Sequence, residues 1–203
     1  MFTGIIQAVG TLSAIMRRGE EAHLRISAGA LDLSDVAAGD SIAVNGACLT
    51  VTSVAGDTFE VDLSGETLMR TTFDRRRIGD PLNLEKALTL RQRLGGHLVN
   101  GHIDGVGRVH ARAENLRSVM MTFEAPSELR RYIAEKGSVC VDGVSLTVNG
   151  VVDGRFDVML IPHTLSVTTL HLLRPGDDVN LEVDLIARYL ERLADGDAGR
   201  ADG

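Results

Sequence analysis

The sequence NGACLTV at residues 45–51 returns as DGVSLTV at residues 142–148, 97 positions further along the chain. The same shift aligns residues 39–72 with residues 136–169 without a gap, and 14 of these 34 positions are identical. It also aligns RIGDPLNLE at residues 77–85 with RPGDDVNLE at residues 174–182, where 6 of 9 positions match. Unrelated segments would match at about one position in fifteen. Two copies of so long a unit exclude a solenoid, so each copy is predicted to be a small domain.

Both copies show the period-two pattern of β-strands. In CLTV, Leu49 and Val51 face one side while Cys48 and Thr50 face the other, and SLTV at residues 145–148 repeats the alternation. Turn residues interrupt the apolar runs about every ten residues, which predicts about six strands in each copy. Closure into a barrel removes the exposed edges of such a sheet. The predicted fold is therefore all-β, with two tandem six-stranded antiparallel barrels related by internal duplication.

Four segments break this pattern. Residues 30–36 and 127–134 are predicted to be helical insertions, and LTLRQRL at residues 88–94 a short helical connection that stops at Gly95 and Gly96. Residues 184–194 carry an apolar stripe at helical spacing, which either packs on its own barrel or on the same helix of other subunits. Residues 195–203 are expected to be a disordered polar tail. The predicted domains are residues 1–97, residues 98–184 and a terminal unit of residues 185–203.

Composition and charge exclude several classes of function. The net charge of -7 and the absence of Trp disfavour nucleic-acid binding, which needs a basic face and stacking side chains. No apolar run approaches the roughly 20 residues of a membrane span, and the start of the chain lacks the basic residues of a signal peptide. We therefore expect a cytoplasmic protein whose two cysteines stay reduced. The six histidines show no HxxxH spacing, so no metal site is expected.

Five motifs occur in register with the duplication: MFTGI, NGxCLTV, GGHLxxGHxDG, KGSVxxDGxSLTV and VNLExD. In this order they resemble the riboflavin synthase alpha-chain family, over residues 1–194. The resemblance implies two Greek-key barrels that each bind one lumazine, and a C-terminal helix that holds three chains together. It implies the last step of riboflavin biosynthesis, in which two molecules of 6,7-dimethyl-8-ribityllumazine give riboflavin and 5-amino-6-ribitylamino-pyrimidinedione by four-carbon transfer, without a cofactor. Active sites between subunits of a homotrimer, and an association with lumazine synthase, are further implications.

The resemblance also assigns residues to two pockets, one in each copy. The N-terminal pocket would use Gly4, Ile5, Ile6, Cys48, Leu49, Thr50, Asp62, Leu63, Ser64, Gly65, Glu66 and Thr67. The C-terminal pocket would use Gly101, His102, Ile103, Lys136, Ser145, Leu146, Thr147, Ile161, Pro162, His163, Thr164, Leu165 and Ser166. The catalytic candidates are Cys48, His102, Ser41 and Asp184. Histidine can move protons near neutral pH, whereas Asp184 also suits the N-cap of the helix that follows it.

Two alternatives remain beside the enzyme. Lumazine proteins share the duplicated fold and hold a fluorescent ligand without chemistry, but both half-sites look intact here, which favours the enzyme. A structural or nucleic-acid-binding pair of barrels is disfavoured by the acidic composition. Because the copies differ at Cys48 and Ser145, we hypothesise that Cys48 assists chemistry on the ring while Ser145 and Thr147 position the second lumazine.

Overall fold

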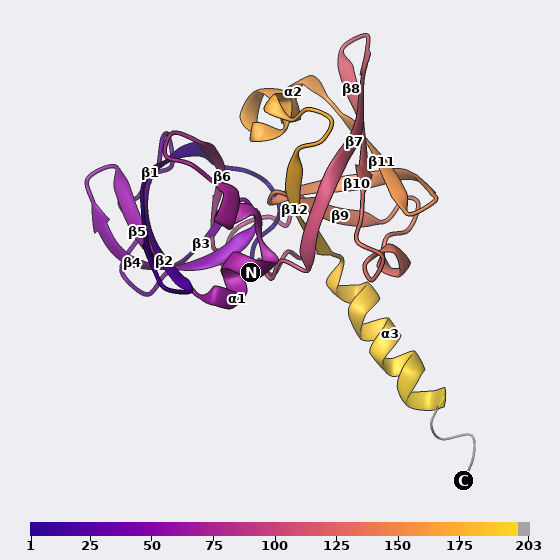
Figure 1. Cartoon of the computed structure of the whole chain (residues 1–203), viewed down its shortest axis with the longest axis horizontal. Helices are drawn as coiled ribbons and strands as arrows, with labels where there is room; N and C mark the ends of the chain where they lie inside the picture. Colours follow the sequence, from indigo (N-terminus) through magenta and orange to yellow (C-terminus); the bar gives the residue numbers. More distant parts are fainter. Residues whose placement is uncertain (199–203) are drawn as a thin grey trace.

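The first copy of the repeat folds into a closed antiparallel barrel in the computed structural model, which describes residues 1–198 (Figure 1). Its strands are β1 (Ala8–Arg18), β2 (Glu21–Ser27), β3 (Ser41–Val44), β4 (Ala47–Ala55), β5 (Thr58–Leu63) and β6 (Pro81–Lys86). The order around the barrel is β1-β2-β5-β4-β3-β6, and β6 pairs with β1 to close it. Helix α1 (Gly65–Arg70) and the 3-10 helix η1 (Thr72–Arg75) lie between β5 and β6.

The second copy repeats this arrangement. Its strands are β7 (Gly105–Asn115), β8 (Ser118–Glu124), β9 (Ser138–Val141), β10 (Val144–Val152), β11 (Arg155–Leu160) and β12 (Asp178–Val183), in the order β10-β11-β8-β7-β12-β9. Its helices are η2 (Arg130–Tyr132), α2 (Pro162–Val167) and η3 (Thr169–Leu172), and α3 (Leu185–Ala198) follows the barrel. The predicted pair of six-stranded antiparallel barrels with a C-terminal helix is confirmed.

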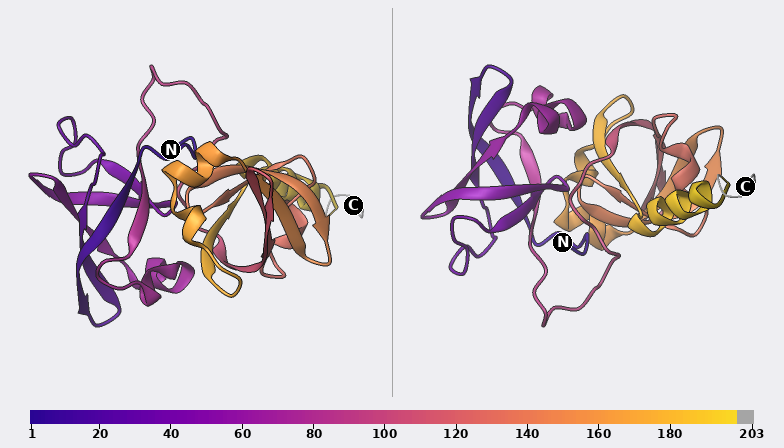
Figure 2. Two further views of the ribbon diagram at one scale, coloured as in Figure 1. Left: turned by 90° about the horizontal axis from the view of Figure 1, so that it is seen from above. Right: turned by 90° about the horizontal axis from the view of Figure 1, so that it is seen from below.

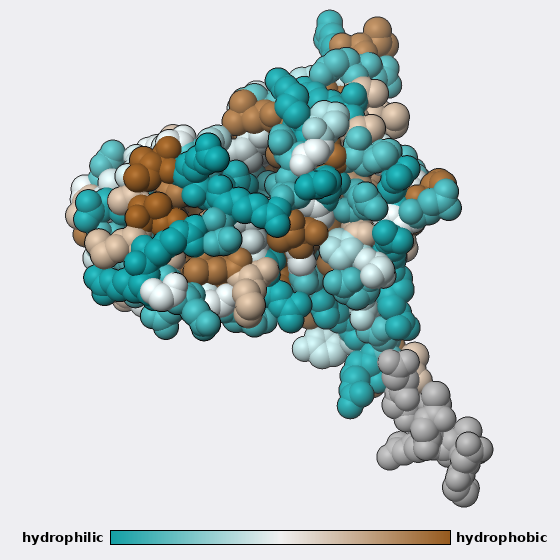
Figure 3. All heavy atoms as spheres, in the orientation of Figure 1, coloured by the Kyte–Doolittle hydropathy of each residue, from teal (hydrophilic) through white to brown (hydrophobic). Residues whose placement is uncertain are grey.

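The period-two rows place the core of each barrel as expected. Leu49 and Val51 are 4% and 1% exposed inside the first barrel, while Thr50 faces outward. Leu146 and Val148 take the same places in the second barrel. Each core is filled by residues from all six strands, so each barrel buries its own apolar interior. The outer face seen in Figure 3 is mainly hydrophilic, with apolar side chains in small separate patches.

An approximate two-fold axis relates the barrels where they meet. The side chain of Asn83 in β6 donates to the carbonyl of Asp142 (2.8 Å), and the side chain of Asn180 in β12 donates to the carbonyl of Asn45 (2.9 Å). Each of these two asparagines also accepts a backbone N–H from the other copy, at 2.8 Å. All four residues are buried. These bonds satisfy polar groups on both sides, which fixes one barrel against the other.

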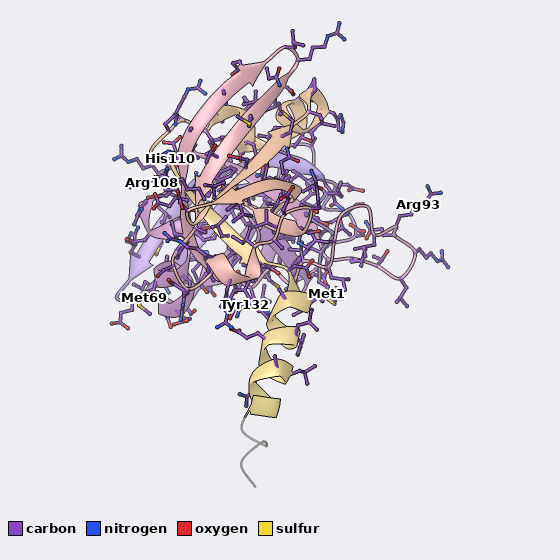
Figure 4. All side chains as sticks on the ribbon, turned by 90° about the vertical axis from the view of Figure 1, so that its right-hand side faces the viewer. Met1, Met69, Arg93, Arg108, His110 and Tyr132 are labelled. Atoms are coloured by element: carbon purple, nitrogen blue, oxygen red, sulfur yellow. The ribbon has the colours of Figure 1, made fainter. Side chains whose placement is uncertain are left out.

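Three predicted helices are wrong or shortened. Residues 30–36 form turns, and in residues 127–134 only the short η2 is helical. Residues 88–94 form an irregular loop that extends outward from between the barrels, with Arg93 at its outer edge (Figures 2 and 4). Leu90 and Leu94 in this loop are exposed. A helix this short needs a surface on which to bury its apolar residues, and the loop has none.

Helix α3 projects away from the second barrel (Figure 1). Its apolar side chains Ile186, Tyr189, Leu190 and Leu193 are 61–68% exposed, so the predicted stripe does not pack on the barrel of its own chain. The helix includes residues 195–198 of the expected polar tail, and the rest of that tail lies outside the described residues. Within residues 1–198, no helix is long and apolar enough to cross a membrane.

Candidate functional site at the crossed arms

Two extended segments cross between the barrels and meet each other on the way. We call residues 2–6 arm one and residues 99–103 arm two; they occupy equivalent places in the two copies. Phe2 and Val99 form an antiparallel bridge, in which the Phe2 N–H donates to the Val99 carbonyl (2.7 Å) and the reverse bond is 3.1 Å. Both side chains are buried. The bridge therefore lies where the two arms pass each other.

Arm two lies against the first barrel, at Cys48. The Cys48 N–H donates to the Gly101 carbonyl at 2.8 Å. Gly101 has φ +80°, and a Cβ on it would lie 2.6 Å from the Cβ of Cys48, so only glycine fits without strain. The next apolar side chain of the arm, Ile103, packs against the core of the first barrel. The second copy thus contributes a wall to the site of the first.

Arm one makes the matching contact with the second barrel, at Ser145. The Ser145 N–H donates to the Gly4 carbonyl at 2.8 Å. Gly4 has φ +73°, and a Cβ on it would lie 2.6 Å from the Cβ of Ser145. Ile6 packs against the core of the second barrel.

The arms are therefore exchanged relative to the sequence prediction. Gly4, Ile5 and Ile6 were expected beside Cys48, and Gly101, His102 and Ile103 beside Ser145; both groupings are wrong. The repeat aligns the two arms with each other, so it cannot tell which barrel each arm reaches. That choice depends on the two-fold arrangement of the barrels.

A buried glutamate in the last strand of each barrel, Glu85 in β6 and Glu182 in β12, binds the backbone of the arm from the same copy. Glu85 accepts the backbone N–H groups of Thr3 (2.7 Å) and Gly4 (3.0 Å), and Glu182 accepts those of Asn100 (2.6 Å) and Gly101 (2.9 Å). Burial raises the pKa of Glu85 and raises that of Glu182 to about 7, against the effect of these bonds. Sequence reasoning did not assign them a role, although the repeated NLE at residues 83–85 and 180–182 marks both positions.

A cavity of about 420 Å³ opens beside Cys48. Its walls come from the start of β4, from α1, from arm two and from α3. The lining residues are Ala47, Cys48, Glu66, Thr67, Arg70, Thr71, Gly101, His102, Ile103, Asp104 and Arg188. The structure thus brings together two of the catalytic candidates, Cys48 and His102, with four of the predicted binding residues. His102 is exposed and can approach a bound molecule from the open side.

The other residues predicted for the first pocket lie outside this cavity lining. Leu49 and Leu63 point into the barrel core, and Thr50 faces outward beside its strand partner Ser41. The Asp62 carboxylate lies 2.7 Å from His23 Nδ1. Ser64 caps α1 by accepting the Thr67 N–H at 3.2 Å, and Gly65 packs against Glu20. Ser64 and Gly65 thus help to fix the segment that carries Glu66 and Thr67 to the cavity.

Helix α3 reaches the same cavity through an ion pair that the sequence did not reveal. Arg188 pairs with Asp104, whose second oxygen accepts the Val183 N–H at 2.7 Å. Burial raises the pKa of Asp104, and the guanidinium of Arg188 opposes this rise. That guanidinium also lies 5.4 Å from the ring centre of Tyr132, beside the base of α3 (Figure 4). Arg188 is therefore held between Asp104, the residue after arm two, and Tyr132 of the second copy.

At the second barrel, Ser145 is half-buried under arm one, while Leu146 is in the core and Thr147 is exposed. Lys136 is exposed, and its N–H bonds the Val148 carbonyl (2.8 Å), three residues along the strand from Ser145. The predicted stretch from Ile161 to Ser166 forms the N-cap and all but the last residue of α2, where Leu165 packs on the core and the Ser166 hydroxyl donates to the His163 carbonyl. It corresponds in the repeat to the segment with Glu66 and Thr67.

Asp184 caps α3, because its carboxylate accepts the Ile186 N–H at 2.9 Å. This is the simpler of the two roles considered from the sequence. Within residues 1–198, no group of three or more His, Cys, Asp and Glu side chains is placed to hold a metal ion.

Two barrels that are each contacted by an arm of the other copy define a class of duplicated-barrel proteins. The chain belongs to the lumazine binding domain family, whose model matches residues 3–87 and 100–184. It is 47% identical over 193 residues to a riboflavin synthase of Photobacterium phosphoreum, covering 95% of this chain and 88% of that one. It is 45% identical over 197 residues to a riboflavin synthase of Mycobacterium bovis, covering 95% and 98%.

Solved structures of LumP share the fold. The structure of LumP complexed with riboflavin superposes with a TM-score of 0.82 at 28% identity, covering 90% of this chain and 99% of that one. The structure of LumP complexed with 6,7-dimethyl-8-(1'-D-ribityl) lumazine gives a TM-score of 0.81 at 26% identity, with the same coverage.

Proposed function

We propose that this chain has riboflavin synthase activity, a transferase reaction between two molecules of 6,7-dimethyl-8-ribityllumazine. The observation that carries the proposal is the identity of 47% and 45% to riboflavin synthases over 95% of the chain, both copies included. The LumP structures are only 28% and 26% identical. The enzyme is therefore favoured over a protein that binds lumazine without chemistry.

The duplicated fold suits this reaction because the two reactants are the same compound. One lumazine gives up a four-carbon unit and leaves as 5-amino-6-ribitylamino-pyrimidinedione, and the other accepts the unit and becomes riboflavin. No atoms or electrons are needed from outside the pair. Related sites at Cys48 and Ser145 would hold one molecule each, and holding both reactants makes their encounter effectively unimolecular.

Association of the chains completes the proposal. The apolar stripe of α3 is exposed in the single chain, so we propose that it packs against the same helix of two other subunits in a homotrimer. Active sites would then form between the first barrel of one chain and the second barrel of its neighbour. A cytoplasmic location and an association with lumazine synthase are proposed on the family resemblance.

The site geometry supports different roles for the catalytic candidates. Cys48 and His102 line one cavity, so we assign them the chemistry on the ring and the movement of protons. Ser145 and Thr147 would position the second lumazine. Ser41 and Asp184 lie outside the lining of this cavity in the single chain, and we propose that they act at the site formed between subunits.

Turnover with dimethylribityllumazine as the only substrate tests the proposal. Purified protein in the presence of a chelator should form one riboflavin for every two lumazines consumed. A protein that binds the lumazine tightly and forms no riboflavin would be a binding protein instead.

The roles of the two copies can be separated by matched substitutions. Cys48→Ala should lower the single-turnover rate by at least tenfold with little change in ligand affinity, because a thiol can take part in catalysis. Ser145→Ala should mainly weaken binding at the second site, by several-fold. Equal small losses in both variants would assign Cys48 to packing alone.

A further inference from the structure

Arm two is anchored in its own barrel but lines a cavity of the opposite one. The Glu182 carboxylate in β12 accepts the N–H groups of Asn100 (2.6 Å) and Gly101 (2.9 Å). The carbonyl of the same glycine accepts the Cys48 N–H of the first barrel at 2.8 Å. Gly101 therefore connects a carboxylate of the second barrel with the cavity beside the first.

A second anchor follows at the end of arm two. The Asp104 N–H donates to the Leu181 carbonyl (2.9 Å), and the Asp104 carboxylate accepts the Val183 N–H (2.7 Å). Leu181 and Val183 are the neighbours of Glu182 in β12, so one strand holds the arm at both places. Residues 102–103 lie between the two anchors, and both line the cavity. Their path is therefore fixed from β12.

Burying Glu182 costs free energy that an apolar residue in the same place would avoid. Glu182 is 4% exposed, and burial raises its pKa to about 7. The interactions that oppose this rise are backbone N–H bonds from residues 100–102 of arm two, and no cation is among them. A buried carboxylate without an ion pair depends on its hydrogen bonds, and a well-packed apolar side chain is often no less stable. What the carboxylate adds is therefore the position of the arm.

We infer that Glu182 is a positioning residue for the lumazine site of the first barrel, although it lies in the second barrel and outside the cavity lining. It fixes the backbone of arm two, and the arm presents His102 and Ile103 to the ligand beside Cys48. The inference rests on the proposed function for the identity of that ligand. The contacts that carry it are present without any ligand.

Glutamine substitutions in the two copies form a matched pair. In Glu182→Gln one acceptor oxygen becomes an NH2 group, which cannot accept an N–H of arm two. Glu85→Gln makes the same change for arm one, whose N–H groups at residues 3 and 4 lie 2.7 and 3.0 Å from the carboxylate. Backbone hydrogen exchange reads each arm separately, because the Cys48 N–H bonds arm two and the Ser145 N–H bonds arm one.

The two variants should have opposite effects. Glu182→Gln should speed exchange at the Cys48 N–H about tenfold, the effect of one lost hydrogen bond to a charged group, and leave Ser145 unchanged. Glu85→Gln should speed exchange at Ser145 and leave Cys48 unchanged. Equal effects of both substitutions at both N–H groups, or no effect of Glu182→Gln at Cys48, would overturn the inference.

Riboflavin titration followed at the Cys48 N–H resonance connects the arm with the ligand. Glu182→Gln should raise the dissociation constant of this site about fivefold, whereas Glu85→Gln should leave it unchanged. An unchanged constant in Glu182→Gln would show that the arm does not position the ligand. Turnover of the lumazine by wild-type protein tests the proposed function separately, since hydrogen exchange needs neither ligand nor chemistry.

The wild-type protein covers the case in which Glu182→Gln does not fold. If Glu182 holds the arm, the N–H groups of Asn100, Gly101 and Cys48 become accessible in one opening of arm two. Their protection factors should then agree within about threefold. A larger excess of protection at Cys48 would show that the N–H groups of the arm open without it, and the inference would fail.

Discussion

Replacing Gly101 by alanine tests whether the exchanged arm is held tightly at the first barrel. Gly101 has φ +80°, and the added Cβ would meet the Cys48 Cβ at 2.6 Å, the Cys48 nitrogen at 2.8 Å and the Phe2 ring at 2.9 Å. Two of these three neighbours are the backbone and Cβ of a paired strand, so they cannot turn aside. The substitution should push arm two away from Cys48.

The expected loss has two parts. A left-handed backbone at a residue with a Cβ costs about 1–2 kcal/mol, and forcing extra volume into a packed site costs about 1–3 kcal/mol. Their sum predicts a loss of about 2–5 kcal/mol in the free energy of unfolding. Gly79→Ala is the matched control, because Gly79 has φ +96° but nothing within 4 Å of the added Cβ. It should lose only the backbone part.

Urea denaturation of both variants measures the difference, and riboflavin titration measures its effect on the site. Gly101→Ala should be less stable than Gly79→Ala by about 1–3 kcal/mol, and it alone should weaken ligand binding. If the two variants lose the same free energy and both bind riboflavin normally, then arm two does not pack against Cys48 as described.

Three further perturbations have defined outcomes. Truncation after Asp184 removes the exposed stripe, so sedimentation should show monomers with both barrels folded and most activity lost; a truncated trimer would contradict this. Arg188→Gln should weaken riboflavin binding about fivefold, whereas Arg131→Gln, which breaks the 2.7 Å pair with Glu191 outside the cavity, should not. The folded chain holds protons on Asp142 (pKa about 6 against 3.8) and Glu182 (about 7 against 4.5) more tightly than the unfolded chain. Its stability should therefore fall as pH rises from about 4 to 7 in urea denaturation, and Asp142→Asn should flatten this dependence.

Much of the fold could be read from local patterns. The repeat of NGACLTV as DGVSLTV predicted two equivalent units, and the alternation around Leu49 and Leu146 predicted which side chains fill each barrel. Side chains on a strand alternate between its two faces whatever the rest of the chain does. The alternation of apolar and polar residues therefore predicts which side chains face the barrel interior and which face solvent. Cys48, Glu66, Thr67 and His102 could be named as candidate site residues because the motifs of this chain resemble those of a family that uses these positions in its pockets.

The helical predictions failed where the apolar pattern was short and no neighbouring surface buried its apolar side chains. LTLRQRL has leucines at helical spacing, yet Leu90 and Leu94 are exposed in a loop. The stripe of α3 has similar spacing over a longer stretch, and the helix forms. A short segment becomes helical only when tertiary contacts bury its apolar face, which the sequence of the segment does not contain.

By itself, the sequence determined the duplication, the strand pattern and the family of the protein. The tertiary structure alone decided which barrel each arm completes, and it brought His97 to Ser145 and Arg188 to the cavity at Cys48. Because the two copies have similar sequences, each arm could pack against the matching strand of its own barrel or of the other barrel. The similarity between the copies does not distinguish these two arrangements. Contacts such as those of Asn83 and Asn180 set the barrels about their two-fold axis, and that packing across the whole chain directs each arm to the opposite copy.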